Sequence, residues 1–138
     1  MDTLYLDSNI LLNVLLEEEG LAESTYKLLQ DIEKGRYSAV TSIMTILEIH
    51  RVLQKYGKEE GVIENIIQGI SSTCIAIIVP ERDDLIAAYE YLRTCRIDPA
   101  DAIHLSVATA SSTIFVTRDK ELGGKIANII KTRRPEDF

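Results

Sequence analysis

Short apolar runs alternate along the chain with longer segments whose spacing of apolar and polar residues favours helices. The runs predict strands at residues 3–6, 37–41, 75–79, 114–117 and 129–131. Helical signals cover residues 10–16, 21–34, 59–70 and 83–94, with further helices beginning at Ser42 and Asp98. This alternation is typical of an α/β fold, and we expect a three-layer sandwich in which helices flank a central, mostly parallel sheet.

Residues that start or stop helices support these boundaries. Asp98 suits the N-cap position and Pro99 the first helical position, which places Asp101 in the first turn of that helix. Gly35 is suited to closing the helix at 21–34. The strand at 75–79 is apolar throughout, which predicts that it is buried within the parallel sheet.

Length and composition limit the setting. With 138 residues, 46% of them hydrophobic, the chain suits a single domain over residues 1–138 with one buried core. No apolar stretch approaches the roughly 20 residues that cross a bilayer, and the first residues enter a strand pattern without a signal segment. We therefore expect a cytoplasmic protein. Cys74 and Cys95 form no CxxC pair and are expected to be buried free thiols.

Four acidic residues lie where the apolar patterning stops: Asp7, Glu48, Asp101 and Asp119. Burial of an unpaired negative charge is costly, whereas a hard divalent cation takes carboxylate oxygens as ligands. Asp7 and Asp119 follow strands, and ligands of open α/β sheets bind beyond the carboxyl ends of strands. If those two strands are neighbours, the four carboxylates can gather around Mg²⁺ or Mn²⁺ at that edge.

These residues also have purely structural explanations. Asp7 and Asp119 could each cap the helix that follows. Glu48 could pair with Arg51 on the same helix face. His104, in the helix that begins after Asp98, could either donate a hydrogen bond to a ligand or simply pack.

The net charge of −7 argues against nucleic-acid binding through bulk electrostatics. It does not exclude a nuclease, because bound metal ions would restore the local charge balance. Basic residues gather near Asp119 and near the end of the chain: Arg118, Lys120, Lys125, Lys131, Arg133 and Arg134. They either approach an anionic substrate or form an ordinary solvated face.

The order of these motifs resembles the PIN-domain family, and within it the VapC-type toxins of prokaryotic toxin–antitoxin modules. The resemblance rests on residues 4–9 (LYLDSN), Glu48 in an apolar helix, residues 98–104 (DPADAIH) and residues 115–119 (FVTRD). It implies a metal-dependent endoribonuclease that holds Mg²⁺ or Mn²⁺. The metal-binding, catalytic residues it implies are Asp7, Glu48, Asp101 and Asp119, with Asn9 and Thr117 as polar support.

The same resemblance implies a homodimer, an RNA substrate and a small antitoxin protein that blocks the site. A groove near Leu28, Leu29 and Leu53 could receive a helix of that antitoxin. The alternative is a non-catalytic RNA- or protein-binding module of the same fold, although no expected acidic position is missing. A phosphate-accepting receiver domain is disfavoured, because residues 80–81 (PE) follow the strand at 75–79 where that class needs an Asp.

Overall fold

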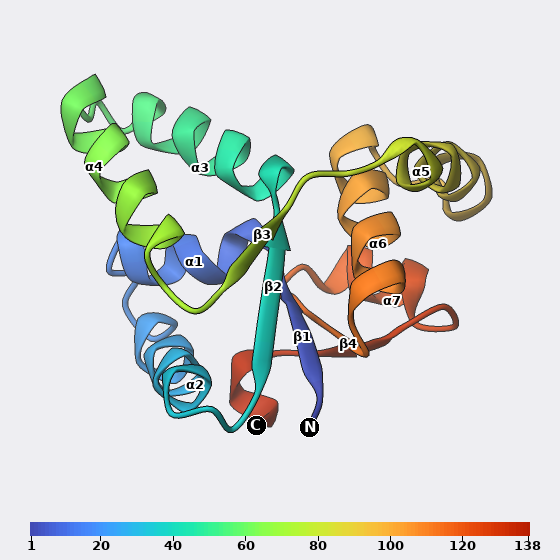
Figure 1. Ribbon diagram of the computed structural model, residues 1–138, viewed down its shortest axis with the longest axis horizontal. Coiled ribbons are helices and arrows are strands. Elements are labelled where there is room, and N and C mark those ends of the chain that lie inside the picture. Colours follow the sequence, from blue (N-terminus) through green and yellow to red (C-terminus); the bar gives the residue numbers. More distant parts are fainter.

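A five-stranded sheet runs through the molecule between two layers of helices (Figure 1). The computed structural model describes residues 1–138. In spatial order the strands are β3 (Ala76–Ile78), β2 (Ser38–Ser42), β1 (Thr3–Leu6), β4 (Ile114–Val116) and β5 (Lys131–Arg133). Every neighbouring pair is parallel, so the carboxyl ends of all strands lie along one edge. The predicted three-layer α/β sandwich is confirmed.

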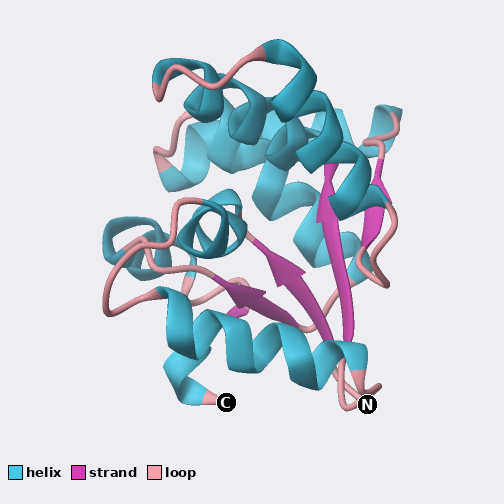
Figure 2. Ribbon diagram, turned by 90° about the vertical axis from the view of Figure 1, so that its left-hand side faces the viewer, coloured by secondary structure: helices cyan, strands magenta, loops and turns pink.

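Helices cover both faces of the twisted sheet, whose strands fan out in Figure 2. One face carries α1 (Ser8–Leu15), α2 (Ala22–Glu33), α3 (Ile43–Lys55) and α4 (Glu60–Ser71). The other face carries α5 (Arg82–Cys95), α6 (Pro99–Ser111) and α7 (Lys120–Ile126), and a short 3₁₀ helix, η1 (Pro135–Asp137), ends the chain. None of these helices is long and apolar enough to cross a bilayer.

The central strand β1 is buried from both sides. Because side chains alternate along a strand, Leu4 and Leu6 enter the core under α1 to α4, whereas Tyr5 enters the core under α5 to α7. The Tyr5 ring stacks on Phe115 of β4, with ring centroids 5.3 Å apart. Apolar cores therefore pack on both faces of β1 and fix the position of Asp7, which follows it.

Some local expectations are wrong. The strand predicted at 75–79 shortens to β3 and is only partly buried, because it pairs with β2 alone and forms the edge of the sheet. Cys74, just before it, is exposed and Cys95 is half-buried, so neither is the buried thiol expected. The last strand starts at Lys131, because the backbone N–H of Ile129 still bonds back to the carbonyl of Ile126 after α7.

Arg118, at the exit of β4, ties the end of the chain to α1 and α2. Its side chain is only 11% exposed and pairs with Glu136, 2.6 Å away. Further N–H groups donate to Asn13 Oδ1 at 2.6 Å, the Leu21 carbonyl at 3.0 Å and Thr25 Oγ1 at 3.1 Å. The guanidinium thus satisfies several enclosed acceptors at once.

Replacing Arg118 by Met should lower the free energy of unfolding by roughly 2–4 kcal/mol, because the enclosed acceptors lose their donor. Urea unfolding measures this as a lower midpoint at an unchanged slope. Arg36→Met is the matched control, since Arg36 pairs with Asp31 at the surface and should matter little. Equal effects of the two substitutions would contradict the role given to Arg118.

Candidate active site

A polar cluster lies at the carboxyl end of β1, beginning with Asp7. This residue is 4% exposed and caps α1, its Oδ1 accepting the Ser8 backbone N–H at 2.8 Å. Its Oδ2 accepts hydrogen bonds from the Thr117 hydroxyl at 2.8 Å and from the Asn9 amide at 3.3 Å. The capping role considered for Asp7 is therefore real. It coexists with a second role, because the same carboxylate also faces the side chains described next.

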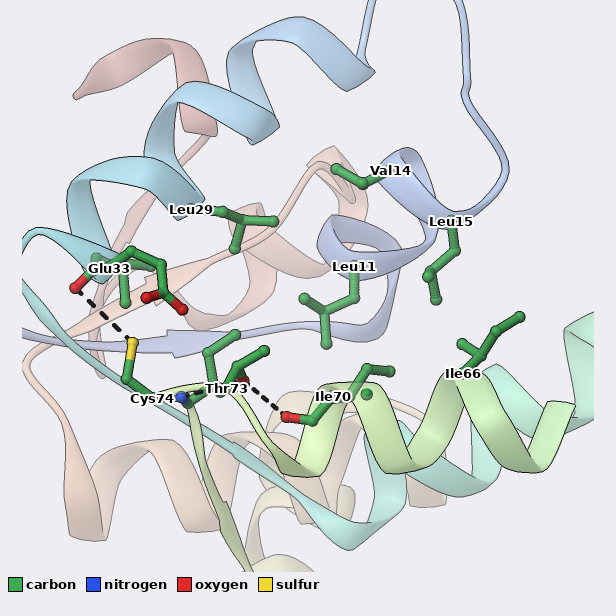
Figure 3. A pocket seen from close by; sticks show the side chains of 12 residues that line it. Leu11, Val14, Leu15, Leu29, Glu33, Ile66, Ile70, Thr73 and Cys74 are labelled. Carbon is green, nitrogen blue, oxygen red and sulfur yellow. Dashed lines mark hydrogen bonds between the residues drawn. The ribbon is translucent and has the colours of Figure 1, made fainter. Parts of the chain in front are cut away.

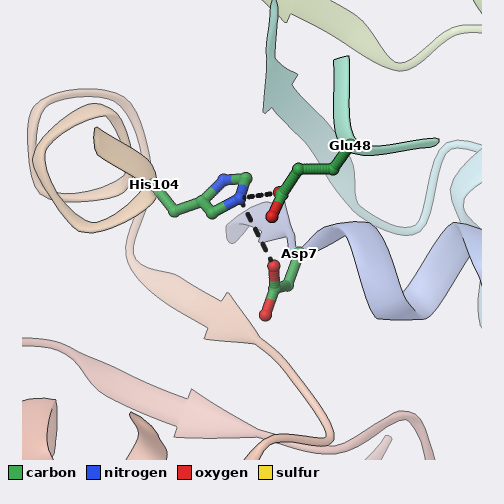
Figure 4. A group of neighbouring side chains, drawn as sticks. All are labelled: Asp7, Glu48 and His104. Carbon is green, nitrogen blue, oxygen red and sulfur yellow. Dashed lines mark hydrogen bonds and ion pairs between the residues drawn. The ribbon is translucent and has the colours of Figure 1, made fainter. Parts of the chain in front are cut away.

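Glu48 from α3 and His104 from α6 complete this cluster (Figure 4). His104 Nε2 lies 2.5 Å from Glu48 Oε1 and 3.7 Å from Asp7 Oδ1. One ligand atom from each of the three residues lies within 4.8 Å of the others. Glu48 pairs with this histidine and not with Arg51, which forms no ion pair. Two carboxylates and an imidazole at this spacing can share one divalent cation.

Buried groups behind His104 orient its ring. The Tyr5 hydroxyl lies 2.6 Å from His104 Nδ1 and donates its proton to Ser42 Oγ at 2.8 Å. The Tyr5 oxygen is therefore free to accept the Nδ1–H of His104, which directs Nε2 towards the carboxylates. The sequence suggested only an auxiliary or packing role for His104. Its contact with Tyr5 spans 99 positions and leaves no local sequence signal.

Asp101 and Asp119 flank the cluster without joining the group of three. Asp101 lies in the first turn of α6, where its backbone N–H donates to the cap Asp98 at 2.9 Å, as predicted. Burial raises the pKa of Asp101 to about 7, and the charges of Asp98, Asp7 and Asp119 add to this rise. Asp119 is exposed and caps α7, its Oδ1 accepting the Leu122 N–H at 3.0 Å.

The cluster carries excess negative charge. Burial raises the pKa of Asp7, although the charge of His104 and the Thr117 hydroxyl oppose the rise. Burial alone would lower the pKa of His104, but the hydrogen bond to Glu48 and the charge of Asp7 reverse the shift. The cluster thus favours bound positive charge, either as protons or as a cation. The oxygen-rich donor set fits a hard divalent ion.

The fold is a parallel α/β sandwich, and acidic residues gather at the carboxyl edge of its sheet. A comparison of the sequence with protein-family models identifies the class of protein to which this arrangement belongs. The PIN domain model matches residues 4–125, and the chain belongs to the PIN domain family. No curated protein matches the chain in sequence.

Several solved structures have a similar fold. A toxin–antitoxin complex from Klebsiella pneumoniae contains a chain with 20% identity and a TM-score of 0.70, covering 95% of this chain and 96% of that one. VapBC2 from Rickettsia felis, bound to a DNA fragment from its promoter, gives 17% identity and a TM-score of 0.75, with coverages of 96% and 98%. VapBC-1 from nontypeable Haemophilus influenzae gives 12% identity and a TM-score of 0.73, covering 97% of this chain and 98% of that one. At these identities the similarity establishes the fold.

The raised pKa of Asp101 has a consequence for stability without metal. The folded chain binds this proton more tightly than the unfolded chain, because the pKa moves from 3.8 to about 7 on folding. The resulting stabilisation is complete below pH 3.8 and is lost as the pH rises through 7. The upward shifts of Asp7 and His104 act in the same direction.

In EDTA, we expect the Tm to fall by on the order of 5 °C between pH 5.5 and 8, measured by calorimetry. Asp101→Asn should flatten this fall, because the amide does not titrate. Asp31→Asn, at a surface pair, should leave the fall in place. A wild-type Tm that stays level or rises over this range would contradict the electrostatic description.

Proposed function

We propose that this PIN domain is a metal-dependent endoribonuclease and the toxin component of a toxin–antitoxin pair. The observation that carries the proposal is the meeting of Asp7, Glu48 and His104 within 4.8 Å at the carboxyl edge of the sheet. Asp7 and Glu48 would hold Mg²⁺ or Mn²⁺. Asp101 and Asp119 would supply the remaining carboxylates from the open side. When bound, such a cation polarises a phosphate oxygen and lowers the pKa of a water towards neutrality.

The protein's own groups position these ligands. Thr117 and Asn9 hold one oxygen of Asp7, so that its other oxygen keeps a fixed direction. His104, anchored by Tyr5, holds the Glu48 carboxylate against Asp7. Such outer contacts limit the movement of ligands and raise the affinity for metal. RNA as substrate and a homodimer as the working form follow from the resemblance to VapC-type toxins, which the similar toxin–antitoxin folds support.

Cleavage of a panel of single-stranded and structured RNAs tests the nuclease. We expect cleavage with Mg²⁺ or Mn²⁺ and none with EDTA. We expect Asp7→Asn and Asp101→Asn to reduce turnover by about 100-fold or more, because each removes a charge from the metal site. Asp31→Asn is the control and should cleave as wild type does. Sedimentation of the same preparation reports whether the active species is a dimer.

If the wild-type protein binds RNA without cutting it, the non-catalytic binding module becomes the better description. If Asp7→Asn retains full metal-dependent turnover, Asp7 is not a ligand and the proposed site is wrong. A monomer with full activity would remove the homodimer from the proposal.

An apolar groove supports the second half of the proposal, the antitoxin partner. It lies between α1, α2 and α4 (Figure 3) and is lined mainly by aliphatic side chains, including Leu11, Val14, Leu15, Leu29, Ile66 and Ile70. Leu28 and Leu53, which the sequence suggested for such a groove, are instead fully buried in the core. An apolar groove of this kind suits the apolar face of an amphipathic helix. We propose that a helix of the antitoxin occupies it.

The product of the neighbouring gene tests this partner. On co-expression it should bind the wild-type chain and suppress RNA cleavage. The double substitution Val14→Glu/Ile66→Glu should abolish this suppression while leaving cleavage intact, because it places charge in the groove. Tyr56→Glu, at an exposed position that does not line the groove, is the control. Suppression that persists in the double variant would exclude the groove as the docking site.

A further inference from the structure

A second pocket opens on the same edge of the sheet, between the ends of β4 and β5 and the start of α7. None of its lining residues is hydrophobic. Six of them carry charge: the basic Arg118, Lys120, Arg133 and Arg134, and the acidic Asp119 and Asp137. The proposed nuclease site does not use these basic side chains.

Two of the four basic side chains form no ion pair, although the charge of Arg133 acts on Asp137 in the same pocket. Arg118 is bound to Glu136, and Arg134 lies 3.2 Å from Asp137. Lys120 and Arg133 appear in none of the ion pairs of the structure. The Arg133 guanidinium donates only to a backbone carbonyl, that of Thr132, at 2.8 Å. In a chain with a net charge of −7, two unpaired cations in one polar pocket point to an anionic ligand.

Thr117 connects the lining of this pocket to the acidic cluster. Thr117 lines the pocket, and its hydroxyl donates to Asp7 Oδ2 at 2.8 Å. The Thr117 backbone N–H donates to the Arg133 carbonyl at 3.0 Å. Because β1, β4 and β5 are consecutive strands of the sheet, the acidic cluster and the basic pocket follow one another along its edge. A polyanion with one phosphate at the cluster can extend into the pocket.

We propose that Lys120 and Arg133 bind a backbone phosphate of the RNA strand next to the phosphate that is cleaved, an inference that rests on the proposed nuclease function. The planar guanidinium of Arg133 suits two phosphate oxygens at once, and Lys120 adds a point charge. No aromatic or other hydrophobic residue lines the pocket, so no ring is present on which a base could stack. It therefore strengthens binding and sets the register of the strand without reading its sequence.

The salt dependence of RNA affinity tests the subsite separately from cleavage. Binding of a fluorescent single-stranded RNA is measured by anisotropy in EDTA at several salt concentrations. Each phosphate contact on a single strand contributes about 0.7 to the slope of log affinity against log salt. Because both residues contact one phosphate, Lys120→Gln/Arg133→Gln should lower the slope by about 0.7. Arg133→Lys, which keeps the charge, should retain most of the wild-type slope.

The control Lys58→Gln/Lys131→Gln removes the same charge. Lys131 lies on β5 with Arg133, yet neither control lysine lines the pocket or forms an ion pair. In cleavage assays with metal, the pocket variant should raise the KM of a longer RNA and leave its kcat unchanged. A dinucleotide, whose only phosphate is the one cleaved, should be processed equally by the wild type and the variant.

A slope equal to that of the control variant would overturn the proposal. Slower cleavage of the dinucleotide would also overturn it, because the two residues would then act at the reacting phosphate. Weaker binding of polyglutamate with unchanged binding of RNA would assign the pocket to an acidic protein segment. If the wild type binds RNA and never cleaves it, the nuclease proposal fails, while the slope still decides whether this pocket binds phosphate.

Discussion

The buried carboxylate of Asp7 is the constraint around which the carboxyl edge of the sheet is organised. It directly follows the central strand β1, at a buried position where an ionised group without partners would be strongly destabilising. Its partners come from separate parts of the chain: Ser8 at the start of α1, Thr117 at the end of β4 and His104 in α6. The start of α1, the end of β4 and the helix α6 therefore all contribute a side chain or backbone group to the surroundings of this one carboxylate.

Charge changes sign along this edge of the sheet. Around β1, the carboxylates outnumber the nearby cations, and burial, with neighbouring negative charge adding to it, raises the pKa of Asp7 and Asp101. Beyond β4, the unpaired Lys120 and Arg133 reverse this balance of charge. A cation at the acidic cluster and a phosphate at the basic pocket would each offset a charge that the fold compensates only in part. On the proposed function, this arrangement would let a chain with a net charge of −7 attract an anionic strand.

Local features were predictable from the sequence, and long-range neighbours were not. The cap at Asp98 and the position of Asp7 after a strand depend on residues adjacent in sequence, and the structure confirms both. The contact between Glu48 and His104 joins positions 56 residues apart and depends on how α3 and α6 meet. Similarly, the apolar run at 75–79 matches a buried strand, but the order of strands in the sheet makes β3 an edge strand. Apolar content alone does not determine strand order.

The most direct test of the central claim is a crystal of the wild-type protein grown with MnCl₂, with diffraction recorded where manganese scatters anomalously. We predict an anomalous peak within coordinating distance of the Asp7 and Glu48 carboxylates. The distance from that peak to His104 Nε2 would decide whether the histidine is a ligand or only orients one. The claim would be contradicted if manganese bound only at other positions, or if no peak appeared at Asp7 under conditions in which the protein cleaves RNA.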